Sequence, residues 1–362
     1  MEEKKWDLEL ECKPDFMKSM DRIYAWYQGE IIDRPPVRFF AHNSFIDPIL
    51  TERKWESVRD KWFDAEFQIE HYISNMQSTS FLGETFPIYW PNLGPNVYAA
   101  FYGYDLIYDE CTSWIEPCKD GWEAINATGF DVQNVYFRKL EELTRHALQR
   151  CEGKFMVGYS DFHPGMDCVA AWRGTQLLCM DLYEDPDWII PTVKKAEENF
   201  HLVFDHFDNM LKERKQLSST WLGIPGYGKM HVPSCDFSAM ISGDHFRRFC
   251  LPAILEEIKP MTHNIFHLDG PGCARHLDDV LGIDAIRAIQ WVQGDGHKSI
   301  MQWIPLIKRI QTAGKSVVVD MSLNELEGFM GETDPKGLFV CLPASDKDTQ
   351  EAVLKTVEKW RR

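Results

Sequence analysis

Residues 264–272 read Asn-Ile-Phe-His-Leu-Asp-Gly-Pro-Gly, and this stretch is the most informative part of the sequence. A short apolar run reaches His267, skips one residue to Asp269 and then breaks at Gly-Pro-Gly, where glycine lets the chain turn without steric cost. Side chains alternate in an extended segment, so we expect His267 and Asp269 on one face at the end of a strand. An imidazole beside a carboxylate can bind a divalent metal or share a proton, and it can equally form a hydrogen bond that only holds a loop.

Strand-like and helix-like segments alternate along the rest of the chain. Alternation over 362 residues predicts an α/β fold with a parallel sheet, either open or closed. No G-x-G-x-x-G follows an early strand, which favours a single (β/α)8 TIM-like barrel domain over 1–362. We expect an N-terminal helical extension at 1–34 and a Pro-, Gly- and aromatic-rich excursion at 81–118 over the barrel mouth. The strands are predicted at 36–41, 85–90, 154–159, 219–224, 263–267, 286–292, 316–320 and 338–342, and the main helices at 55–76, 131–150, 186–214, 244–258, 272–281, 299–313 and 348–361.

Charge and composition exclude several classes of protein. The chain has 39 basic and 56 acidic residues, a formal charge of −17, which argues against nucleic acid and anionic membrane surfaces as partners. No apolar run reaches the ~18 to 20 residues of a membrane span, and residues 1–7 lack the apolar core of a secretory signal, so we expect a cytoplasmic protein. Its ten cysteines form no C-x-x-C. An anionic substrate would need clustered positive charge, for which the candidates are Arg34, Arg38, Arg173, Arg247 and Arg248.

Polar residues gather where the predicted strands end. In a (β/α)8 barrel these ends converge on one mouth, where active sites lie. Solvated loops also carry polar residues, so each position taken singly can be without function. The residues at strand ends are His42, Asp161, His163, His267, Asp269, Gln290, Gln293, Asp320 and Cys341.

Three kinds of role follow from these residue types. His267, Asp269 and Cys341 offer nitrogen, oxygen and sulfur for an open zinc site whose fourth position takes substrate. Asp161 and His163 share a face and can serve as general acid and base, or form a local hydrogen bond. Asp236, a third catalytic candidate, either points into the mouth or caps the helix that follows it. The remaining candidates for substrate binding, among which the aromatic residues can equally be core, are His42, Trp90, Tyr98, Tyr227, Gln290, Trp291 and Asp320.

Several segments resemble the uroporphyrinogen decarboxylase superfamily. They are residues 25–37 (Ala-Trp-Tyr-Gln-Gly-Glu-Ile-Ile-Asp-Arg-Pro-Pro-Val), residues 236–242 (Asp-Phe-Ser-Ala-Met-Ile-Ser) with 246–252 behind them, and the strand ending at His267. The resemblance spans nearly the whole chain and implies a distorted (β/α)8 barrel. It implies one of two activities: decarboxylation of the acetate arms of uroporphyrinogen without a cofactor, or zinc-dependent methyl transfer involving a corrinoid protein.

The sequence departs from both branches of that superfamily. The decarboxylases begin their barrel with R-Q-A-G-R, whereas residues 38–43 read Arg-Phe-Phe-Ala-His-Asn, and residues 86–91 offer no aspartate. An octa-anionic porphyrinogen therefore matches this chain poorly. The methyltransferases use H-x-C and a late cysteine as zinc ligands; His267 and Cys341 match these, but Asp269 replaces the first cysteine, and Cys273 could substitute if its loop folds back. Exchanging thiolate for carboxylate makes zinc more Lewis-acidic and suits a methyl group bound to oxygen or nitrogen.

The leading prediction is a zinc-dependent methyltransferase that moves a methyl group between a small methylated substrate and a corrinoid protein. The chain lacks the D-x-H-x-x-G cobalt-binding signature, so cobalamin is expected on a separate partner docked over the mouth. The first alternative is a metal-free carboxy-lyase acting on a small carboxylated or tetrapyrrole substrate, with Asp161, His163 and Asp269 as acid and base. The second is a catalytically idle barrel kept as a binding protein. A homodimer is compatible with all three.

Overall fold

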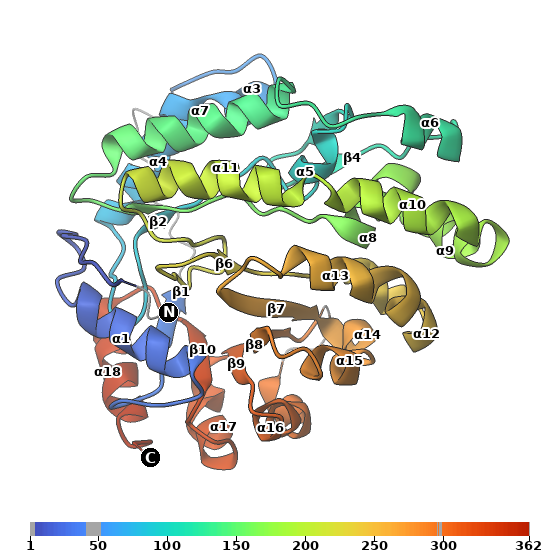
Figure 1. The fold of residues 1–362 in the computed structure, drawn as a ribbon. Helices are drawn as coiled ribbons and strands as arrows, with labels where there is room; N and C mark the ends of the chain where they lie inside the picture. Colours follow the sequence, from blue (N-terminus) through green and yellow to red (C-terminus); the bar gives the residue numbers. More distant parts are fainter. Residues whose placement is uncertain (1–3, 41–51, 295, 297–298, 362) are drawn as a thin grey trace.

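A computed structural model describes residues 4–40, 52–294, 296 and 299–361. Strands and helices alternate along the chain, as predicted, with helices packed around a curled parallel sheet (Figure 1). The strands are β1 (Val37–Phe40), β2 (Ile88–Tyr89), β3 (Leu106–Tyr108), β4 (Ser113–Ile115), β5 (Met156–Val157), β6 (Met230–His231), β7 (His263–Asp269), β8 (Ile286–Val292), β9 (Ser316–Asp320) and β10 (Leu338–Pro343).

The helices lie mainly between successive parallel strands. They are α1 (Phe16–Tyr27), α3 (Val58–Phe63), α4 (Ala65–Gln77), α5 (Val97–Ala100), α6 (Trp122–Ala127), α7 (Val135–Arg150), α8 (Gly165–Arg173), α9 (Thr175–Glu184), α10 (Pro186–Glu197), α11 (Phe200–Glu213), α12 (Gly243–His245), α13 (Leu251–Glu257), α14 (Gly270–Ala274), α15 (Leu277–Leu281), α16 (Ile304–Thr312), α17 (Leu326–Glu332) and α18 (Lys347–Val357), with the 3-10 helices η1 (Asp236–Met240), η3 (Ile300–Trp303) and η4 (Leu323–Glu325) and the π-helix η2 (Phe246–Cys250).

Six parallel strands form the main sheet in the order β1-β10-β9-β8-β7-β6. The first strand thus pairs with the last, with Arg38 opposite Cys341, as in a barrel that closes on itself. Strands β2 and β5 form a separate parallel pair. Within the described residues no ladder joins this pair to the main sheet. Before β2, Glu84 N donates to Val37 O on β1 (2.7 Å), and after β5, Tyr159 N donates to Ser219 O in the segment that precedes β6 (2.9 Å). The sheet is therefore TIM-like but is not a continuous closed ladder.

Alternate side chains of the main sheet enter two different cores. The outward-facing side chains pack under the surrounding helices, where Phe266, Val319 and Val340 lie in the large cluster. Inward-facing side chains such as Ile265 and Val318 fill a smaller cluster inside the curl. This alternation follows from the period of two of a strand. We call the mouth the side of the sheet at which the parallel strands end. The polar residues at the strand ends share the inward-facing positions, so the same alternation directs their side chains toward the mouth.

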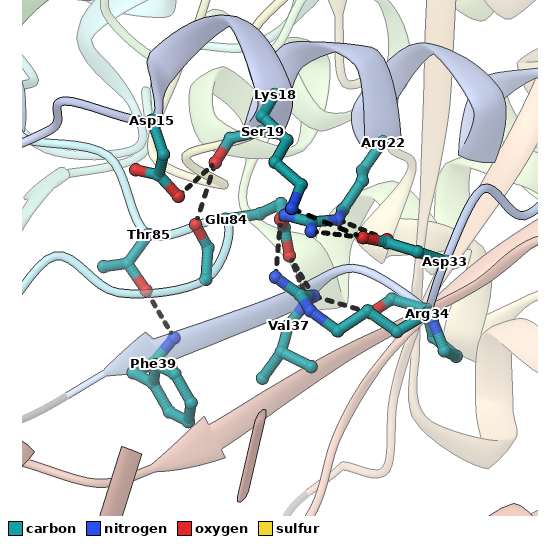
Figure 2. A network of polar contacts seen from close by, with 12 residues as sticks. Asp15, Lys18, Ser19, Arg22, Asp33, Arg34, Val37, Phe39, Glu84 and Thr85 are labelled. Carbon is teal, nitrogen blue, oxygen red and sulfur yellow. Dashed lines mark hydrogen bonds and ion pairs between the residues drawn. The ribbon is translucent and has the colours of Figure 1, made fainter. Parts of the chain in front are cut away.

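The N-terminal extension is attached to the sheet by a buried ionic network (Figure 2). Glu84 is fully buried and accepts hydrogen bonds from Arg22 (3.1 Å), from Arg34 (2.7 and 3.0 Å) and from the backbone N–H of Val37 (2.7 Å). Arg22 also binds Asp33 through two nitrogens. A buried carboxylate is tolerated because both its oxygens have charged partners. Helix α1 is thereby held against the entry to β1.

Several predicted elements are corrected by the structure. The predicted strand 219–224 is a turn, because Gly223 adopts φ +67°, and the short strand β6 follows it instead. The predicted helix 55–76 is two helices, broken where Asp64 caps α4 by accepting from Phe67 N. The predicted helix 186–214 likewise divides into α10 and α11. The excursion 81–118 contains the antiparallel β3–β4 hairpin, and helices α8 and α9 were not predicted.

Candidate functional site

Three possible metal ligands converge at the mouth. One ligand atom each of Asp236, His267 and Asp269 lies within 4.8 Å of the other two. His267 and Asp269 lie two residues apart on β7, so they share one face, as predicted from the sequence. Asp236 is the first residue of η1, which follows β6, the neighbour of β7 in the sheet. The set offers one imidazole nitrogen and two carboxylate oxygens, which are donors that zinc accepts.

Backbone contacts hold the two segments of this cluster together. The backbone N–H of His267 donates to the carbonyl of Pro233 (2.9 Å), and Ser234 forms a parallel bridge with His267. Beyond β7 the chain passes directly against η1: a Cβ placed on Gly272 would lie 2.8 Å from the Cβ of Ala239. Glycine is therefore required for this close approach.

His267 is oriented by a neighbouring strand. Its Nδ1 lies 2.7 Å from Oε1 of Gln290 on β8, so the amide oxygen accepts the Nδ1 proton and Nε2 keeps its lone pair. The Trp221 ring lies edge-on to the imidazole, with centroids 5.3 Å apart. A partner of this kind fixes the tautomer and the ring plane of a metal-ligating histidine. Gln290, predicted to bind substrate, contacts His267 through this hydrogen bond, and substrate binding by Gln290 stays a prediction.

Cys341 lies outside this group of three described residues. Its side chain is buried on the inward face of β10, opposite Arg38 on β1 and Asp320 on β9. Burial, with the Asp320 carboxylate, raises the pKa of the Cys341 thiol well above its usual range. The close cluster therefore contains the Asp236 carboxylate where the sequence suggested a thiolate, and ligation by Cys341 stays a prediction. Cys273 is buried beneath η1, where it accepts from Ser238 Oγ (3.4 Å), and it too lies outside the group.

The predicted acid–base pair is part of a longer hydrogen-bonded chain. His163 Nε2 lies 2.7 Å from Asp161 Oδ2, and His163 Nδ1 lies 2.9 Å from Ser234 Oγ. Burial favours the neutral imidazole, but the carboxylate of Asp161, with those of Asp167 and Asp236, outweighs it and raises the pKa of His163 to about 10. His163 is therefore a cation at neutral pH with both nitrogens engaged. This geometry fits a fixed charge better than a proton donor.

A pocket of about 420 Å³ lies beside the hydrogen-bonded residues Asp161, His163 and Ser234. His163, Asp167 and Asp236 form its polar wall, and Pro95 and Ile115, from the excursion 81–118, lie among its apolar lining. Small side chains of α8 and the turn after it complete the wall. The excursion therefore borders the space next to Asp236. The other lining residues are Asn96, Pro117, Ala170, Ala171, Gly174, Thr175, Phe237 and Met240.

Three aromatic residues predicted to wall the substrate site belong to the core. Tyr98 is fully buried among Phe101, Tyr102, Phe162 and Phe200. Trp291 faces outward on β8 and packs on Trp303, with centroids 4.7 Å apart. Tyr227 precedes β6, at the opposite end of the strands from the mouth, and donates its hydroxyl proton to the carbonyl of Trp6 (2.7 Å). The prediction that these three residues wall the substrate site is therefore wrong. Residue type alone could not show this, because an aromatic ring packs in a core as readily as it lines a pocket.

The remaining substrate-binding candidates occupy different places. Trp90 lines a second pocket of about 430 Å³, together with Trp55, Trp62 and His71. Asp320 is exposed at the end of β9, and its carbonyl accepts from Gln293 Nε2 (2.8 Å). His42 lies outside the described residues. Asp167 is the main residue that the sequence reasoning missed, since it lies on α8 and the search for polar residues at strand ends could not find it.

Comparison with known proteins gives a fold relationship. No family model matches the chain, and no curated protein matches it. Among solved structures, a methyltransferase from Methanosarcina mazei superposes with a TM-score of 0.60 over 94% of this chain and 98% of that chain, at 10% sequence identity. At this identity the likeness establishes a shared fold. In the part of the chain that the structure describes, no helix is long and apolar enough to cross a membrane.

Proposed function

We propose that this protein is a zinc-dependent methyltransferase that moves a methyl group between a small methylated substrate and a corrinoid protein. The observation that carries the proposal is the convergence of Asp236, His267 and Asp269 at the mouth. Active sites of TIM-like folds lie at this end of the strands. The shared fold with a methyltransferase supports the reaction class by analogy.

The residues around the cluster suit this role. Nε2 of His267 and the Asp269 carboxylate would hold zinc, with Asp236 or, as the sequence suggests, Cys341 as the third ligand, and the fourth position would stay open for substrate. Bound zinc would supply Lewis acidity toward the oxygen or nitrogen that carries the methyl group. Gln290 keeps the Nε2 lone pair of His267 available, and the Asp161–His163 pair presents a fixed dipole beside the pocket. The pocket of about 420 Å³ next to Asp236 would bind the small substrate.

A separate corrinoid protein would carry the cobalamin. The excursion 81–118 borders the pocket, and its β3–β4 hairpin exposes Ile107 and Trp114. Exposed apolar side chains near a site are typical of surfaces that contact another protein. We therefore propose this hairpin as part of the docking rim.

The alternative, a metal-free carboxy-lyase, lacks a basic site for carboxylates among the candidates from the sequence. Arg34 is paired with Glu84, Arg173 with Asp181 (2.6 Å) and Arg247 with Asp244 and Asp279. Arg38 donates to the carbonyl of Leu222 (2.8 Å), next to Asp320. Each of these four charges already has a partner, so a carboxylated substrate would have to compete for it. The fifth candidate, Arg248, is exposed and lies over the Phe249 ring, 4.6 Å from the ring centroid, so it offers a single charge and not a cluster.

Zinc content and methyl transfer test the proposal together. We expect the purified protein to hold about one zinc per chain. His267→Ala should lose it and His201→Ala, a change on the outer helix α11, should keep it. With a methylated donor and a corrinoid protein, the Co(I) absorption should disappear with the native enzyme and persist with His267→Ala. A zinc-free protein that resists chelators and releases carbon dioxide from a carboxylated substrate would establish the carboxy-lyase instead.

A further inference from the structure

Asp167 connects helix α8 to the segment that carries Asp236. Its Oδ2 accepts the backbone N–H of Asp236 (2.9 Å) and its Oδ1 accepts the backbone N–H of Phe237 (2.9 Å). Ser234 Oγ, which also bonds His163, lies 3.4 Å from Oδ2. One carboxylate therefore contacts two consecutive amides at the start of η1. These amides have no partner within the helix itself, so the carboxylate satisfies them as a capping group does.

The direction of the Asp236 side chain depends on these two amides. Asp236 is exposed, and its carboxylate points to His267 and Asp269 from a 3-10 helix of five residues. So short a helix has few internal hydrogen bonds with which to fix its first residue. Near its C-terminal end η1 is fixed by Gly272, which packs against Ala239. The carboxylate of Asp167 fixes the N-terminal end, where Asp236 lies.

Helix α8, which carries Asp167, is held in place by packing in the core. Its residues Cys168, Val169 and Trp172 are buried, and the Trp172 indole donates to the carbonyl of Ala99 (3.0 Å). Asp167 lies in the first turn of this helix, between the buried residues Met166 and Cys168. A side chain on a packed helix holds its partner more accurately than one on a loop.

We propose that Asp167 is a positioning residue that presents the Asp236 carboxylate to the metal; this inference rests on the zinc site of the proposed function. Partners that orient the ligands of a metal site typically contribute about 10- to 100-fold in metal affinity. Asp167 would act through Asp236 and would not touch the metal. Its removal should therefore weaken zinc binding only in a chain that still has Asp236.

The test compares zinc affinity, measured by chelator competition, in four variants. Asp167→Asn keeps the size of the side chain but presents an amide N–H to one of the two backbone N–H groups, so zinc affinity should fall about 10- to 100-fold. Asp187→Asn, an exposed aspartate on α10, should bind zinc as the native chain does. Asp236→Ala should also weaken binding, and the double variant Asp167→Asn/Asp236→Ala should bind no more weakly than Asp236→Ala alone. Additive losses in the double variant, or native affinity in Asp167→Asn, would overturn the proposal.

Amide hydrogen exchange tests the same proposal without metal. The amides of Asp236 and Phe237 should exchange faster in Asp167→Asn than in the native chain, while those of β7 stay unchanged. Unchanged exchange at both amides would overturn the positioning role. If the native chain binds no zinc, the proposed function fails by itself, and the exchange rates still decide whether Asp167 holds Asp236. The melting temperature of each variant separates local loosening from loss of the fold.

Discussion

His267 and Gln290 lie opposite each other on adjacent parallel strands, with Nδ1 of the imidazole 2.7 Å from Oε1 of the amide. The register of β7 and β8 sets this pair, so the backbone of the sheet determines which ring nitrogen faces the mouth. Gln290 is buried, and water therefore cannot easily replace its oxygen. Because the strand register sets this hydrogen bond, the sheet itself orients one ligand of the candidate metal site.

The first prediction concerns this pair. Gln290→Met keeps the length of the side chain and removes the acceptor, so His267 loses the group that fixes its tautomer. We expect zinc affinity to fall about 10-fold, measured by chelator competition. Gln133→Met, at an exposed position, serves as the control. Equal affinity in the two variants would show that the tautomer of His267 is fixed without Gln290.

The second prediction separates the two candidates for the third ligand. Asp236 lies within the cluster of close ligand atoms, whereas Cys341 is buried beside Arg38 and Asp320. Asp236→Asn should therefore weaken zinc binding more than Cys341→Ser does. Cobalt substitution gives an independent measurement, because a thiolate ligand adds a charge-transfer band in the near ultraviolet. A band that Cys341→Ser abolishes would instead assign the ligand to Cys341.

The sequence predicts much of the sheet because its inner strands are short apolar runs bounded by turns. Strands β8 and β9 begin and end where the residue pattern places them, and the alternation in β7 puts His267 and Asp269 together. The stretch 219–224 has the same apolar character, but Gly223 turns the chain there. A local sequence pattern shows which side chains are apolar. It does not show which backbone angles the packed fold imposes on them.

The sequence places His267 and Asp269 together because they lie two residues apart on one strand. It also offers Asp236 as a candidate for the mouth, but the place of Asp236 beside them, and the contact of Asp167 with its backbone, depend on how η1 packs against β7 and α8. The pattern along a single segment does not show such contacts between elements. Tyr98 and Trp291 are assigned to the substrate site by the sequence and do not belong to it. Both have the residue type of a pocket wall, and the fold buries both in the core.

The third prediction concerns the network that attaches the N-terminal extension. Glu84→Gln leaves the buried Arg34 without its counter-charge and leaves Arg22 with Asp33 alone. The free energy of unfolding should fall by ~3 to 5 kcal/mol, as for other broken buried ion pairs. Urea unfolding measures this value. Glu327→Gln, which breaks an exposed pair with Lys359, should cost ~1 kcal/mol or less, and similar losses in both variants would contradict a special role for Glu84.

The fourth prediction is a pH dependence that arises from His163. Its pKa is about 10 in the folded chain and 6.5 as the ordinary value, so protonation stabilises the folded state. That stabilisation is fully present below pH 6.5 and is lost as the pH rises through 10. The difference in unfolding free energy between the native chain and His163→Gln should therefore be largest near pH 6 and shrink toward pH 10. A difference that is constant over this range would show that the charge of His163 contributes nothing.

The fifth prediction is a stabilising substitution at Glu197. Burial, with the nearby carboxylates of Glu257 and Glu256, raises the pKa of Glu197 to about 7 from 4.5. Its ionised form therefore opposes folding, by an amount that grows between pH 4.5 and 7 and is constant above that. Glu197→Gln should raise the free energy of unfolding at pH 8 by ~1 to 3 kcal/mol and change it little at pH 4. Glu198→Gln, the exposed neighbour, is the matched control, and urea unfolding at the two pH values measures both variants. A Glu197→Gln protein that is less stable at pH 8 would mean that the carboxylate has a favourable partner when ionised.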